Sequence, residues 1–202
     1  MGSLTIGVDI GQKVDPTAIC VAEQDERTER DQAPPAMHHL IRHMERLPLG
    51  TPYPAVSHRI AVICRGVFER TGTRPDLHLD ATGVGQPVVD ELVALRPAVQ
   101  RVIACYFTHG DRRTEERSRV TIGKAWLVSR LQALLQGGRV HLPRQLAEAE
   151  ALTRELLDYE IRVSEDANDK YGAFKVGTHD DLVTALGLAT QTDRRPMRLT
   201  LI

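Results

Sequence analysis

Four aspartates stand where carboxylates could do chemistry, at the ends of otherwise apolar segments. Asp9 lies near the end of the first apolar stretch, and Asp80 ends a second one. Asp180 and Asp181 open the last helical pattern of the chain. Gathered carboxylates repel one another unless they are protonated or neutralised by cations. Oxygen ligands suit Mg²⁺ and Mn²⁺, and two such ions about 3.5–4 Å apart hold the attacking and leaving oxygens of a phosphoryl displacement. The four acids therefore predict catalytic ligands for two ions, provided that the fold brings them together.

Each acid also has a simpler interpretation. Asp80 could be a turn or helix-capping residue. Asp180 could be the N-cap of the last helix, with Asp181 favouring the helix dipole. The combination of acids on several separate elements favours the metal site, whereas Asp15, which directly precedes a proline, is assigned to a turn.

A predicted β-hairpin carries the first acid. Apolar residues alternate with small or polar ones from Leu4 to Gly11, which is the period of a pleated strand. Gly11, Asp15 and Pro16 supply turn chemistry, and the run 17–21 resumes a β-rich pattern. Burying an acid in such a strand is costly unless a positive charge meets it.

Strands and helices then follow in an order that favours a mixed sheet. After the hairpin, a charged segment over 23–36 is predicted to be a solvated loop or a strand extension. Further strands are predicted over 38–49, 76–80, 99–107, 139–142, 159–163 and 171–176. Helices are predicted over 54–71, 87–95, 122–136, 143–158 and 178–189. Three strands joined by short connections favour an antiparallel meander, and later strands separated by helices favour parallel crossovers. The predicted class is α/β, with one domain over 1–193 and a tail over 194–202.

Composition bounds the remaining possibilities. The 202 residues carry a formal net charge of −1, which neither supports nor excludes a nucleic-acid partner. No run reaches the roughly 18–20 apolar residues of a membrane span. Cys20, Cys64 and Cys105 are widely spaced in apolar runs, which predicts buried, reduced thiols of a cytosolic protein rather than a zinc site. His39 and His43 lack an acidic partner and are predicted to be exposed strand histidines.

Four segments together resemble the nuclease domain of phage large terminase subunits. They are GVDIGQKVDPTAI, LDATGVGQPVVDEL, GKAWLVSRLQALLQGGRVHLP and KYGAFKVGTHDDLVTALGLA, in chain order. The resemblance runs from Leu4 to Ala189, and its most specific motif is the HDD-L-V-x-A-L helix after a strand. It implies a ribonuclease H-like fold. It also implies a nuclease that cuts double-stranded DNA with two divalent ions, Mg²⁺ or Mn²⁺, during genome packaging.

The resemblance also implies site residues and partners. Asp9, Asp80 and one or both of Asp180 and Asp181 become metal ligands, with Asp181 favoured as essential and His179 close by. An ATPase motor domain, a portal and a small terminase subunit become expected partners, and the host-cell cytoplasm the expected location. No G-x-x-x-x-G-K-[ST] motif occurs in the sequence. The chain is therefore expected to be a nuclease domain by itself, as a piece of a longer terminase or a shortened relative.

The segment from His109 to Lys124 is predicted to border the DNA. Its basic residues outnumber its acids, and cations contact phosphate without reading sequence. The alternative for this segment is a solvated loop with local ion pairs. The predicted DNA-binding residues are Arg112, Arg113, Arg117, Arg119 and Lys124, with Lys170 and Lys175 as secondary candidates.

Other functions are less consistent with the sequence. An actin-like nucleotide-binding protein needs two domains around a cleft, for which the chain is too short. A dinucleotide site at Gly83 and Gly85 lacks the third glycine and the strand order. A Holliday-junction resolvase would share fold and metals, and a non-catalytic DNA-binding or assembly module would share only the fold.

Overall fold

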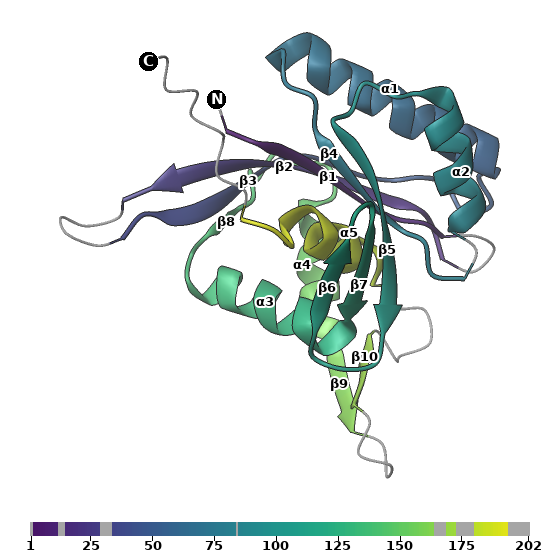
Figure 1. Cartoon of the computed structure of the whole chain (residues 1–202). Helices are drawn as coiled ribbons and strands as arrows, with labels where there is room; N and C mark the ends of the chain where they lie inside the picture. The colour runs from purple at the N-terminus through teal and green to yellow at the C-terminus, as the bar shows by residue number, and fades with distance from the viewer. Residues whose placement is uncertain are drawn as a thin grey trace.

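A mixed sheet forms the centre of the molecule (Figure 1). The structure is a computed structural model that describes residues 2–11, 15–28, 34–83, 85–163, 169–172 and 180–193. Its eight-stranded sheet has the order β6-β7-β5-β4-β1-β2-β3-β8. These strands are β1 Leu4–Asp9, β2 Ala18–Arg27, β3 Ala36–Arg46, β4 Asp76–Asp80, β5 Arg101–Thr108, β6 Arg113–Glu116, β7 Arg119–Gly123 and β8 Val140–His141. A separate two-stranded sheet pairs β9 Glu160–Val163 with β10 Asp169–Gly172.

The sheet topology confirms the predicted meander and crossovers. The first three strands pair antiparallel in chain order. Next to them, β4 pairs parallel with β1, β5 parallel with β4, and β7 parallel with β5. One helix lies in the chain between β3 and β4, and another lies in the crossover from β4 to its parallel neighbour β5. The predicted α/β mixed sheet is therefore confirmed.

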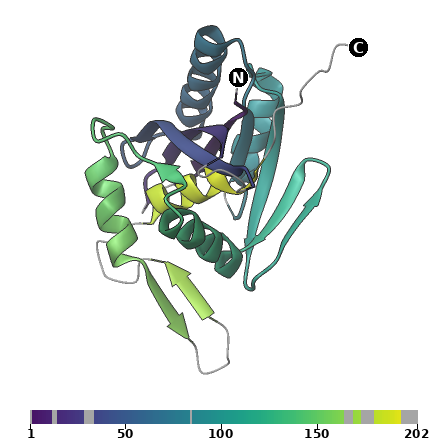
Figure 2. The same ribbon diagram turned by 90° about the vertical axis from the view of Figure 1, so that its left-hand side faces the viewer.

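Five helices cover the two faces of the sheet among the described residues. They are α1 Tyr53–Thr71, α2 Gln86–Leu95, α3 Lys124–Gln136, α4 Ala149–Asp158 and α5 Asp181–Thr190. On one face, α1 and α2 pack against apolar side chains of β1, β2 and β4. On the other, α3, α4 and α5 pack against β2, β3, β5 and β7 (Figures 1 and 2). No helix in the described part of the chain is long and apolar enough to cross a membrane.

Close contact between α5 and β1 depends on Gly7. A Cβ at this position would lie 2.2 Å from the Ala185 carbonyl oxygen and 2.4 Å from the Ala189 nitrogen. Any side chain would therefore push the helix off the strand. The glycine lets the helix backbone lie directly on β1, so the start of α5 reaches the end of the strand that carries Asp9.

Several predictions about individual elements need correction. Residues 113–123, predicted as part of a polar segment and a helix start, instead form the β6–β7 hairpin. The apolar pattern there is weak because β6 is an edge strand and only Val120 and Ile122 of the hairpin face the core. The prediction of an exposed His39 is wrong: it is fully buried, with its Nε2 3.2 Å from an Asp193 carboxylate oxygen. The helix predicted from residue 143 begins at Ala149.

Other predictions hold or lie outside the described residues. All three cysteines are buried and free, as predicted. The predicted strand over 76–80 is confirmed residue for residue. The segments 173–179 and 194–202 are outside the described part, including His179, Lys175 and the predicted tail.

Candidate metal centre

One end of the sheet gathers Asp9 and Asp80. Val8 and Leu79 are partners in the parallel β1–β4 pair, so the two acids are the next residues along neighbouring strands. Ligand sites of open α/β sheets lie at such carboxyl ends. Since side chains alternate along a strand, Asp9 shares the face of Gly7, which is the face that α5 covers. The start of α5 therefore lies beside Asp9.

The electrostatics of Asp9 show that the acids are close. Burial raises the pKa of the Asp9 carboxyl well above its usual value, and the charges of Asp80, Asp180 and Asp181 raise it further. Lys124 is the described residue whose charge opposes this rise. A negative charge on Asp9 is thus unfavourable in the protein without cations.

The negative charge of Asp80 is only partly balanced by its neighbours. Burial raises the pKa of its carboxyl, while hydrogen bonds from Thr82 and the charge of Lys124 lower it. The Thr82 backbone N–H donates to Asp80 Oδ1 at 2.8 Å, the turn interaction that the simpler interpretation of this residue requires. Unlike the other residues of β4, which are buried, Asp80 is partly exposed.

The two acids at the start of α5 differ sharply in their contacts. Asp180 occupies the N-cap position and is half-exposed, but its side chain makes no capping hydrogen bond. Asp181 is only 2% exposed and faces Arg46 of β3, whose Nε lies 2.7 Å from Oδ2 and whose Nη2 lies 3.3 Å from Oδ1. Arg46 Nη2 also donates to Glu155 of α4.

Arg46 and Glu155 are site residues that the sequence analysis missed. Neither belongs to a recognisable motif. Arg46 lies far in sequence from Asp181, and Glu155 lies far from the Leu182 and Val183 amides that donate to it. Arg46 is placed by sheet register: it pairs with Ala18, which pairs with Asp9 on its other side. Only the assembled sheet brings this arginine into the row of the acids.

The carboxylates fit divalent ions by charge, although they do not form a ready cage. No group of three or more His, Cys, Asp or Glu side chains in the described part of the chain is arranged to hold an ion. Mg²⁺ usually keeps several waters and uses one or two carboxylates together with substrate phosphates. Two ions that keep waters and bind substrate phosphates need only a few carboxylates at one end of the sheet. They do not need a site in which every ligand comes from the protein. The unfavourable negative charge on Asp9 is what such cations would relieve.

The predicted DNA-binding residues differ in their exposure and in their contacts with the rest of the protein. Arg113 donates hydrogen bonds to Gln191 and Glu115, at 2.9 and 2.8 Å. The guanidinium of Arg119 stacks over the Tyr106 ring at 4.1 Å. Arg112, Arg117, Arg119 and Lys124 are all exposed, and Lys124 Nζ lies 5.9 Å from the centre of the Phe107 ring. Lys170 lies in β10, of whose side chains nothing is described, and Lys175 lies outside the described residues.

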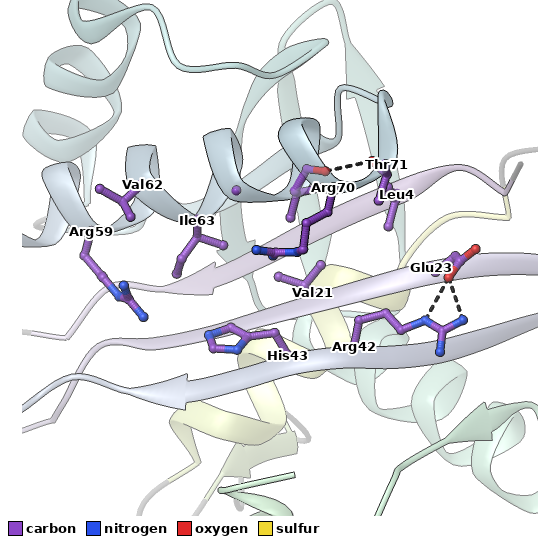
Figure 3. A pocket seen from close by; sticks show the side chains of 12 residues that line it. Leu4, Val21, Glu23, Arg42, His43, Arg59, Val62, Ile63, Arg70 and Thr71 are labelled. Carbon is purple, nitrogen blue, oxygen red and sulfur yellow. Dashed lines mark hydrogen bonds and ion pairs between the residues drawn. The ribbon is translucent and has the colours of Figure 1, made fainter.

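A cavity lined by α1 and three strands lies away from the acids. It has a volume of about 500 Å³ and lies between α1 and the strands β1, β2 and β3 (Figure 3). Arg59 and Arg70 extend from α1 toward the strands, where Arg42 pairs with Glu23 at 2.7 Å. This face is opposite to the one that carries Asp9, so the cavity has no part in the metal centre.

The fold and the acids at its strand ends define the class of structure as ribonuclease H-like. Comparison with protein-family models finds no match, and comparison with curated proteins finds none either. Three solved structures nevertheless share the fold over most of both chains, and all three are nuclease domains of viral terminases.

The first is the large terminase nuclease of thermophilic phage G20c with bound magnesium, with a TM-score of 0.59 and 22% identity, covering 93% of this chain and 80% of that one. The human cytomegalovirus terminase nuclease domain has a TM-score of 0.60 and 15% identity, with coverages of 94% and 82%. The large terminase nuclease domain of bacteriophage SPP1 with bound Mn has a TM-score of 0.55 and 11% identity, with coverages of 95% and 87%. These similarities confirm the predicted resemblance to terminase nuclease domains at the level of the fold.

Proposed function

We propose that this protein is a metal-dependent endonuclease that cuts double-stranded DNA with two Mg²⁺ or Mn²⁺ ions. The observation that carries the proposal is the meeting of Asp9, Asp80, Asp180 and Asp181 at one sheet end, where their charges raise the pKa of Asp9. The magnesium- and manganese-bound terminase nucleases of the same fold support divalent ions as cofactors.

The chain's own residues would act by holding charge in place. Asp9 and Asp80 would hold the ions from neighbouring strands, and a carboxylate at the start of α5 would complete the ligands. Bound ions would activate the attacking water and stabilise the leaving oxygen. Lys124, which begins α3 beside the acids, would contact phosphate and oppose the negative charge of the site when no ion is bound.

The DNA path that we propose follows the exposed cations of the β6–β7 hairpin. Arg112 and Arg117 are exposed there, and Lys124 lies between the hairpin and the acids. Such contacts would position a duplex by its phosphates without reading its sequence. Arg113, which donates hydrogen bonds to Gln191 and Glu115, would support the hairpin instead. Arg119 is exposed and stacks on Tyr106. The motor, portal and small-subunit partners implied by the resemblance stay predictions.

Plasmid digestion tests the proposal. Supercoiled plasmid is incubated with wild type, Asp9→Ala or Asp80→Ala in Mn²⁺, Mg²⁺ or EDTA. We expect nicking and linearisation by wild type with either metal, and none by the variants or in EDTA. Asp76→Asn, at the opposite end of β4, is the matched control that should retain metal-dependent cutting. Full activity in EDTA, or in Asp80→Ala, would refute the mechanism.

A four-way junction in the same assay separates the related alternatives. Symmetric cutting of the junction in preference to plasmid would indicate a resolvase. Retarded migration of linear duplex without cutting in any metal would indicate a DNA-binding module. A nuclease of the proposed kind cuts linear duplex or plasmid with little sequence preference.

A further inference from the structure

We propose that Arg46 and Glu155 are positioning residues of the metal centre. Together with Asp181 they form a buried ionic cluster that fixes the first turn of α5 against the sheet end, and this cluster leaves Asp180 as the metal ligand of that helix. The inference rests on the proposed nuclease function and assigns different roles to the two adjacent aspartates.

The cap of α5 comes from another helix. The first N–H groups of a helix have no partner within it, and a side chain at the N-cap position usually accepts from them. In α5 that acceptor is Glu155 of α4, whose Oε2 receives the N–H groups of Leu182 and Val183 at 3.0 and 3.2 Å. Asp180 stands at the N-cap but makes no capping bond. Its carboxylate is therefore not used by the helix and is available to an ion.

Asp181 is used by the fold instead. Its two carboxylate oxygens face Nε and Nη2 of Arg46, the forked geometry in which a guanidinium holds a carboxylate most firmly. Asp181 and Glu155 are 2% and 7% exposed. Acids this buried need a positive partner, and Arg46 serves both. The partial positive charge of the α5 N-terminus adds to that compensation.

The cluster joins three elements beside the proposed metal ligands. Arg46 ends β3, Glu155 lies in α4, and Asp181 begins α5. Arg46 lies in the same cross-strand row as Asp9. The cluster therefore fixes the position of the first turn of α5 along the strands, and with it the distance of that turn from Asp9. Residues that orient metal ligands through such contacts influence metal affinity without touching the metal. This reverses the sequence-based preference for Asp181 as the essential acid.

Metal binding and amide exchange test the assignment together. Mn²⁺ affinity is measured by calorimetry for wild type, Arg46→Lys, Glu155→Gln, Asp181→Asn and Asp180→Asn. Hydrogen exchange of the Leu182 and Val183 amides is measured on the same proteins without metal. Asp76→Asn is the matched control, because Asp76 is a similarly buried acid that two guanidinium nitrogens of Arg101 bind at the other end of β4.

We expect the three cluster variants to bind Mn²⁺ about 10–100-fold more weakly, with faster exchange of the two amides. Arg46→Lys keeps the positive charge, so the protection of the two amides from exchange should fall less in Arg46→Lys than in Glu155→Gln. Asp180→Asn should abolish most Mn²⁺ binding without changing amide exchange. Asp76→Asn should bind Mn²⁺ like wild type, whatever its melting temperature.

Two results would overturn the inference while leaving the nuclease intact. Cluster variants that melt earlier but bind Mn²⁺ like wild type would show a purely structural role. Asp181→Asn with wild-type amide exchange and a loss of affinity equal to that of Asp180→Asn would make Asp181 a ligand. If Asp181→Asn does not fold, Arg46→Lys and Glu155→Gln decide. A wild-type protein that neither binds Mn²⁺ nor cuts DNA would instead refute the proposed function, and the inference with it.

Discussion

The two ends of β4 carry acids on the same face with opposite electrostatic surroundings. Asp76 is 5% exposed, and both of its oxygens face Arg101, at 3.2 and 3.1 Å. Asp80, at the other end, has the Thr82 amide and the more distant charge of Lys124. Burial raises the pKa of both carboxyls, but only at Asp76 does a directly bonded cation oppose it. The charge of an acid that is bonded to an arginine is balanced within the protein, whereas the charge of one without a bonded cation can be balanced by a ligand.

His78 lies between these acids and shows a third situation. It shares their face of β4, is 1% exposed, and neither ring nitrogen has a hydrogen-bond partner among the described residues. Burial and the charges of Arg113 and Arg101 lower the pKa of His78 to about 3. One strand face thus holds a paired acid, an unpaired neutral base and an acid that is open to ligands.

The largest expected difference between the two ends is the response to metal. Mn²⁺ at 100 times its dissociation constant should stabilise wild type by about 2.7 kcal/mol. Asp80→Asn should lose this stabilisation because a proposed ligand is gone, while Asp76→Asn should keep it. Thermal melts with and without Mn²⁺ measure both effects. Equal Mn²⁺ shifts in the two variants would remove the distinction between the ends of the strand.

The second difference is in the stability of the metal-free protein. Asp76→Asn should destabilise it by about 2 kcal/mol, less than the roughly 3–5 kcal/mol of a fully buried pair because Arg101 remains partly exposed. Asp80→Asn should not destabilise it, since removing one of several like charges relieves repulsion. Urea unfolding in EDTA measures both free energies. A loss at Asp80→Asn equal to that at Asp76→Asn would mean that Asp80 is a structural acid.

The smallest effect concerns His78 and pH. The unfolded chain binds a proton at this histidine below its usual pKa of 6.5, while the native protein does not until about 3. Since the unfolded state then binds more protons, the histidine lowers stability progressively as pH falls from 6.5 toward 3. His78→Leu should abolish this loss, which amounts to about 1 kcal/mol near pH 6. Urea midpoints of both proteins at pH 8 and pH 6 test it, and parallel changes in the two would contradict a buried neutral imidazole.

The elements of the fold followed largely from local patterns. The strand over 76–80 alternates apolar and polar residues, and α1 carries its buried Val56, Ile60 and Ile63 at helical spacing. The β6–β7 hairpin did not follow, because an edge strand with exposed side chains leaves little periodicity. Nor did the burial of His39, which depends on Asp193 at the far end of the chain.

The sequence by itself determined the acids, the strands and helices that carry them, and the glycine that lets α5 lie on β1. It did so because side-chain periodicity and the absence of a Cβ are local properties. Only the tertiary structure decided how the charges are matched. Arg101 binds Asp76, Arg46 and Glu155 bind the start of α5, and no arginine in the described part of the chain is bonded to Asp80. The physical reason is that an ionic interaction depends on distance in space, and strand register and helix packing set that distance between residues far apart in the chain.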